Sequence, residues 1–129
     1  MPVELKVLGL AALLQAGQLI LMAIPVNRQL GVGYTAGPRD EPQQPTGIAG
    51  RLLRACDNHF EGLILFTIAV LVVVLGDRSD GWTAACAWVY LVARVLYVPA
   101  YAWGVFLLRS ALWAVGFLAT LALLLLGLF

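Results

Sequence analysis

One short segment of this otherwise apolar chain carries polar side chains at helical spacing. In RACDNHFEG, residues 54–62, Arg54, Asn58 and Glu61 follow one another at intervals of four and three residues. That spacing places the three side chains on one face of a helix. A guanidinium, an amide and a carboxylate at the edge of an apolar run need either partners within the protein or a bound ligand.

A second polar stripe lies further along the chain. Arg94 is followed by Tyr97 and Tyr101 at intervals of three and four residues, again on one helical face. Guanidinium and phenol donors gathered at one depth suit a bound anion, such as a carboxylate or a thiolate. The alternative interpretation is structural: Arg94 pairs with a carboxylate, Glu61 or Asp57, and the pair links two helices.

The composition indicates that these two stripes belong to a membrane protein. The chain is 62% hydrophobic and 12% charged, with a mean hydropathy of +0.92. A bilayer core about 30 Å thick is crossed by roughly 20 apolar residues of helix, and hydrocarbon offers backbone groups no partners, so the spans are expected to be helices. We predict four spans, at about residues 5–27, 52–76, 81–108 and 110–129.

The connections between these spans predict the architecture. Only the stretch at about residues 28–50 is long, and it is rich in glycine and proline. The other two connections are short, which makes neighbouring helices antiparallel. We therefore expect a single all-α membrane domain over residues 1–129, an up-down-up-down four-helix bundle.

The basic residues predict the orientation. The first loop holds Arg28, Arg39 and Arg51, and Arg109 lies in the third connection, whereas Lys6 and Arg78 are the only basic residues on the other side. Because cytoplasmic loops carry the excess of Lys and Arg, we expect the first and third loops in the cytoplasm and both termini on the opposite side.

Other partners are not indicated by the composition. A net charge of +1 gives no case for nucleic acid. The two cysteines, Cys56 and Cys86, have no metal-ligand spacing, so no metal is expected.

The polar segments resemble a known family. RACDNHFEG resembles the R-A-x-x-N-x-x-E motif that opens the second helix of the MAPEG family, the membrane-associated proteins of eicosanoid and glutathione metabolism. ARVLYVPAYAWG, residues 93–104, resembles that family's third helix, in which an Arg is followed by aromatic or His residues. The length, the four spans and the long first loop are similar as well.

The resemblance implies a homotrimer that binds glutathione as co-substrate between neighbouring subunits. The residues that would hold glutathione are Arg28, Arg54, Asn58, Glu61, Arg94, Tyr97 and Tyr101. Arg109 is the expected stabiliser of the glutathione thiolate, and Tyr101 is the second candidate. The thiolate would attack an apolar electrophile, or reduce a lipid hydroperoxide, that arrives from the bilayer.

The chain also departs from the family pattern. Gly62 follows Glu61 where many members have an aromatic residue, no proline follows within a turn, and Asp57 stands where some members are basic. Two alternatives to a transferase or peroxidase therefore stay open: a protein that keeps the fold without catalysis, and a small channel or transporter subunit. Glutathione binding separates the enzyme from both, and ion flux identifies a channel.

Overall fold

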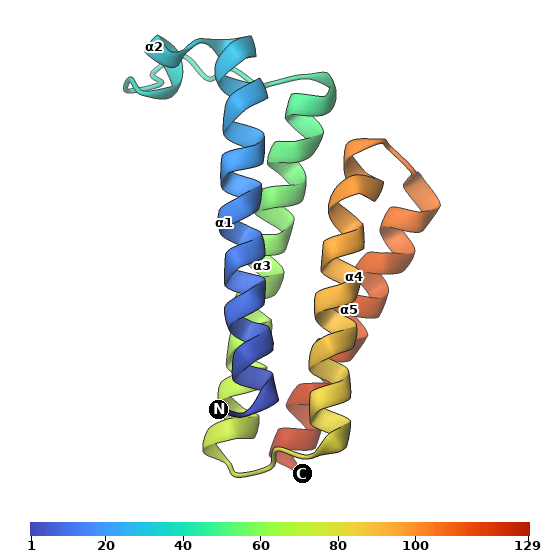
Figure 1. Ribbon diagram of the computed structural model, residues 1–129. Helices are drawn as coiled ribbons and strands as arrows, with labels where there is room; N and C mark the ends of the chain where they lie inside the picture. Colours follow the sequence, from blue (N-terminus) through green and yellow to red (C-terminus); the bar gives the residue numbers. More distant parts are fainter.

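The computed structural model describes residues 1–129 and contains helices and no strands. Its four long helices are α1 (Val3–Leu30), α3 (Gly47–Leu75), α4 (Gly81–Ala102) and α5 (Phe106–Leu128), and α2 (Val32–Thr35) is a single turn. Each long helix has the length and apolar composition to cross a membrane. They run alternately up and down, with both termini at one end and the long loop at the other (Figure 1). The predicted membrane four-helix bundle is confirmed.

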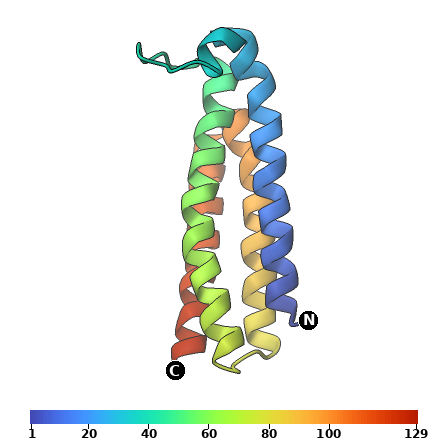
Figure 2. The same ribbon diagram turned by 90° about the vertical axis from the view of Figure 1, so that its left-hand side faces the viewer.

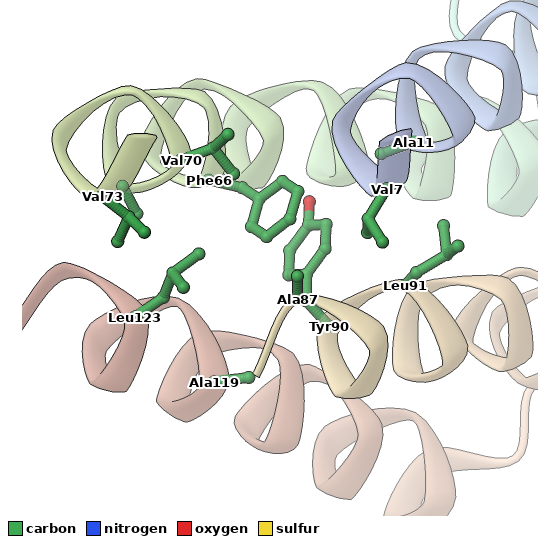
Figure 3. Packing of buried hydrophobic residues seen from close by; sticks show 11 residues of the cluster. Val7, Ala11, Phe66, Val70, Val73, Ala87, Tyr90, Leu91, Ala119 and Leu123 are labelled. Carbon is green, nitrogen blue, oxygen red and sulfur yellow. The ribbon is translucent and has the colours of Figure 1, made fainter. Parts of the chain in front are cut away.

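Two helices at the centre hold the bundle together. α3 and α4 pack against each other and against both α1 and α5, whereas α1 and α5 do not touch. The core between them is small and apolar (Figure 3), and within it Phe66 stacks on Tyr90, with ring centroids 3.9 Å apart. Large apolar side chains are exposed along all four helices, which is the surface that hydrocarbon requires.

The turn between α4 and α5 comes earlier than the sequence predicted. Gly104 has φ +69°, the left-handed conformation that glycine adopts without steric penalty. The N–H of Val105 donates to the carbonyl of Ala100 at 2.9 Å, and the N–H of Gly104 to that of Tyr101 at 3.0 Å. This pair of bonds is the Schellman motif, which satisfies the last carbonyls of a helix. Arg109, expected in the connection, therefore lies in the beginning of α5.

A buried carboxylate closes the end of the bundle where the termini lie. Glu4 is fully buried and accepts hydrogen bonds from the hydroxyls of Ser79, at 2.8 and 2.7 Å, and Thr83. Asp80 and Thr83 form a capping box at the start of α4, a reciprocal arrangement that satisfies the first N–H groups of a helix. The first turn of α1 is thereby attached to the α3–α4 connection.

The long loop folds back on the opposite end. α3 begins at Gly47, five residues before the predicted span, so the loop is shorter than expected. Gln29 and Thr46 bond each other reciprocally, and Tyr34 accepts from the N–H of Gln43 at 2.7 Å. α2 and the residues after it project sideways from the bundle axis (Figures 1 and 2).

Candidate functional site

The two polar stripes meet at the loop end of the bundle. Arg54, on α3, donates from its Nε to the hydroxyl of Tyr101, on α4, at 3.1 Å. On α5, the guanidinium carbon of Arg109 lies 4.8 Å from the centroid of the same ring. Tyr97, one turn before Tyr101, has its ring centroid 5.6 Å from that of Tyr101. Three helices therefore contribute to one cluster of donors around Tyr101.

Two adjoining cavities open beside this cluster. The first, which we call the Tyr101 cavity, has a volume of about 280 Å³ and is lined by Asn58, Tyr97, Tyr101, Arg109, Ser110 and Trp113. The second, which we call the arginine cavity, has a volume of about 230 Å³ and is lined by Arg51, Arg54, Tyr101, Gly104, Phe106 and Arg109. They share Tyr101 and Arg109, and together they have the size of a small-molecule site.

The charge of these cavities is positive. Arg51, Arg54 and Arg109 line them, and no Asp or Glu does. Arg51 is fixed by a hydrogen bond from Nη1 to the carbonyl of Ala102 at 3.2 Å, and Arg109 also lies over the ring of Phe106, at 5.2 Å. Guanidinium groups held in place by such contacts bind carboxylates in a defined geometry.

Arg94 lies deeper than the other arginines and outside both cavities. It is 3% exposed, and its guanidinium carbon stands 4.2 Å from the centroid of Tyr97. Its Nε and Nη2 have no hydrogen-bond partner, and the side chains of Asp57 and Glu61 are exposed. The alternative of an Arg94–carboxylate pair that links the helices is therefore not found within the protomer, because both carboxylates point away from the bundle interior.

The predicted residues fall into two groups. Those that the structure brings together are Arg54, Asn58, Tyr97, Tyr101 and Arg109, and Arg94 adjoins them through Tyr97. Arg28 and Glu61 line neither cavity and are exposed on the protomer. Helical spacing shows which residues share a face, but it does not show which neighbour covers each part of that face.

Some residues of the site were missed by the sequence analysis. Arg51 precedes Arg54 by three residues, and Trp113 follows Arg109 by four, so each shares a helical face with a residue that was singled out. Ser110 is the residue next to Arg109. A search for residues three or four positions from Arg54 and Arg109 would have identified Arg51 and Trp113.

A buried polar link on the inner side of α3 was also missed. Nδ1 of His59 lies 2.7 Å from Oε1 of Gln15, on α1, and Nε2 of Gln15 donates to Sγ of Cys56 at 3.3 Å. All three residues are buried. This link attaches α1 to α3 next to Asn58 in the sequence.

Comparison with known protein families gives a match over nearly the whole chain. A family model described as the MAPEG family matches residues 7–129, which is nearly the whole chain. No curated protein matches the chain. The matched region contains all four long helices except the first turn of α1, together with every residue that lines the two cavities.

Proposed function

The chain belongs to the MAPEG family, and from this premise we propose that it is a glutathione-dependent membrane enzyme. Membership indicates a membrane protein of glutathione or eicosanoid metabolism. The observation that carries the finer proposal is the contact of two arginines with one phenol: Arg54 bonds the hydroxyl of Tyr101 and Arg109 lies over its ring. This arrangement opens on cavities without acidic side chains.

Glutathione fits the chemistry of these cavities. The tripeptide has two carboxylates, one amine and one thiol, so its site needs cations, hydroxyl donors and a carboxylate. Arg51 and Arg54 would bind a carboxylate in the arginine cavity, and Asn58 would bond the peptide backbone from the Tyr101 cavity. Arg109 lines both cavities. It would therefore lie beside the thiol, which stands between the two ends of glutathione.

The proposed unit is a homotrimer. Arg28 and Glu61 are exposed on the protomer, although the resemblance to the family assigns Glu61 to glutathione through the motif and makes Arg28, outside the motif, a further candidate. In a trimer their side chains would reach the site of a neighbouring subunit, where Glu61 would supply the carboxylate for the amine of glutathione. Arg94 would act through Tyr97, whose ring it contacts.

The proposed chemistry starts with the thiol. A free thiol has a pKa of about 8.5, and a nearby cation lowers it, so Arg109 would raise the fraction of thiolate at neutral pH. The thiolate sulfur would form a bond to an electrophilic carbon while the leaving group departs with the electron pair. With a lipid hydroperoxide, two glutathione molecules would be oxidised to the disulfide as the hydroperoxide becomes an alcohol and water.

An apolar second substrate has a surface to bind on the same hairpin. A cavity of about 400 Å³ lies at the α4–α5 turn, and its lining residues, Leu96, Pro99, Ala100, Trp103, Val105, Leu108 and Leu112, are all uncharged and almost all hydrophobic. Trp103 and Leu108 are exposed there, and in a membrane they would contact the hydrocarbon. An electrophile dissolved in the bilayer could bind this surface without crossing water.

Calorimetric titration of glutathione into the detergent-purified protein tests the proposal. Saturable binding is expected for the wild type, and it should be lost in Arg54→Gln and retained in Arg78→Gln, a matched change at the opposite end of the bundle. Absence of binding by well-folded wild type would overturn the proposal. Anion or cation flux through liposomes would then favour a channel.

A further inference from the structure

A small cavity lies between α3, α4 and α5 and shares one lining residue, Trp113, with the Tyr101 cavity. Its volume is about 30 Å³, and Arg94, Gly62 and Gly116 are among the residues that line it. A cavity volume of about 10–15 Å³ is enough to hold one water molecule. The cavity, which we call the Arg94 cavity, therefore has room for a water molecule or a small ion and is far too small for a peptide.

Arg94 lines this cavity and has hydrogen-bond donors without a partner. Arg94 is 3% exposed, and its Nε and Nη2 have no hydrogen-bond partner. The ring of Tyr97 covers one face of the guanidinium at 4.2 Å. A contact with the face of the ring satisfies part of the charge, but it leaves the N–H groups in the guanidinium plane without an acceptor.

No side chain of the cavity compensates the charge. None of its lining residues is Asp or Glu, and the hydroxyl of Thr120 already donates to the carbonyl of Gly116 at 2.9 Å. A buried charge without a counter-charge is strongly destabilising in a low-dielectric interior. The cavity therefore favours an anion over a neutral particle of the same size.

Two glycines make the space. A Cβ added at Gly116 would lie 3.4 Å from Cδ of Arg94, and one added at Gly62 would lie 3.8 Å from the hydroxyl of Tyr90. Both distances are ordinary contacts, so a methyl group fits at each position without displacing a neighbour. The same methyl at Gly116 would occupy part of the cavity next to Arg94.

We propose that the Arg94 cavity is a binding site for a monatomic anion, chloride in the cell, held by the guanidinium N–H groups of Arg94. The ion neutralises Arg94 and so keeps its guanidinium against Tyr97, which lines the Tyr101 cavity. The small volume favours an ion of one atom over a free carboxylic acid or phosphate molecule, and a carboxylate carried on a side chain is distinguished by the test below. This site does not depend on glutathione being the ligand of the larger cavities.

The test is thermal unfolding of the detergent-purified full chain in sodium bromide, chloride or gluconate at equal sodium concentration and without glutathione. A ligand that binds only the folded state raises Tm with its concentration, and we expect a saturating rise of about 4 °C from gluconate to bromide. Arg94→Gln should abolish this rise. Arg109→Gln removes an arginine from the larger cavities and should keep it, which controls for general salt effects.

A second variant keeps the test decisive if Arg94→Gln does not fold. Gly116→Ala retains the charge and narrows the cavity, and we expect it to lose most of the bromide effect. Crystals grown in bromide should show anomalous scattering within hydrogen-bond distance of Arg94. Equal Tm in all three salts, or a bromide-dependent rise in Tm that persists in Arg94→Gln or Gly116→Ala, overturns the proposal. It is also overturned if the crystals show water or the Glu61 carboxylate in the cavity in place of bromide.

Discussion

The Nε of Arg54 donates to the hydroxyl of Tyr101 across 3.1 Å, although the two residues are 47 positions apart in the chain. This bond joins the polar stripe of α3 to that of α4. It also orients the Tyr101 ring, over which Arg109 lies at 4.8 Å. One phenol therefore fixes the relative positions of two arginines from different helices.

Removing the Tyr101 hydroxyl tests this bond directly. In Tyr101→Phe the Arg54 Nε loses its acceptor, and a hydrogen bond to a charged group is worth about 1.5–3 kcal/mol. We expect glutathione affinity to fall about tenfold or more, measured by calorimetry. Tyr34→Phe is the matched control, because the Tyr34 hydroxyl bonds only within the loop. Equal losses in both variants would contradict an orienting role for Tyr101.

Removing the Arg109 charge is expected to affect the rate more than the binding of glutathione. Loss of a charged group that stabilises a developing or reactive anion reduces turnover by about 10²-fold. In Arg109→Gln the bound thiol should ionise nearer pH 8.5, so the rate–pH curve with a soluble aryl halide should move to higher pH. Arg78→Gln, at the other end of the bundle, should leave both rate and curve unchanged. A parallel loss of rate at every pH would assign Arg109 to binding alone.

The buried carboxylate of Glu4 is expected to stabilise the bundle. Glu4→Ala removes the charged acceptor of the Ser79 hydroxyl and one of the two acceptors of the buried Thr83 hydroxyl, which keeps the carbonyl of Asp80 at 3.0 Å. A hydrogen bond to a charged group is worth about 1.5–3 kcal/mol. We expect a lower Tm in detergent, with glutathione binding retained at low temperature because the site lies at the opposite end. Glu4→Gln keeps one acceptor oxygen and should lose less. A Tm unchanged in Glu4→Ala would show that water replaces the carboxylate.

α5 packs closely against α3 at Gly127, whereas Gly9 on α1 has open space beside it. We therefore expect substitution by alanine to have opposite effects on stability at these two glycines. A Cβ at Gly127 would lie 2.9 Å from Cγ2 of Val73 and 3.2 Å from its backbone nitrogen, whereas nothing lies within 4 Å of a Cβ at Gly9. Gly127→Ala should therefore destabilise the protein by about 1–3 kcal/mol through overpacking. Gly9→Ala, in the middle of α1, should be neutral or stabilise by up to about 1 kcal/mol. Chemical unfolding of both variants in the same micelles makes the comparison, and equal effects would exclude tight packing at Gly127.

Much of the fold and half of the site follow from the sequence. Hydropathy determines that the chain forms apolar spans, and short connections make them antiparallel. The spacing of Arg54 and Asn58, and of Tyr97 and Tyr101, was sufficient to place these residues on the faces that meet. Periodicity is a property of one helix, so it predicts which side chains lie together on that helix.

The remaining features depend on contacts between helices. Because Gly104 adopts the left-handed conformation, α4 ends before it and Arg109 lies in α5. No periodic signal in the sequence distinguishes this glycine from the others in the spans. The exposure of Glu61 and the burial of Arg94 without a carboxylate partner depend on the rotation of α3 against α4. The orientation in the membrane and the homotrimer stay predictions.

The attachment of Glu4 to the α3–α4 connection makes the two ends of the molecule unequal in dynamics. At that end a helix terminus, a turn and a capping box are joined by buried hydrogen bonds, whereas at the other end the backbone runs through a long loop that projects from the bundle. Local opening is easiest where few buried contacts must break. Amide hydrogen exchange should therefore be slow at the ends of α3 and α4 near Ser79 and fast in the loop that precedes Gly47, so that thermal motion concentrates at the end of the bundle that carries the arginines while the opposite end stays rigid.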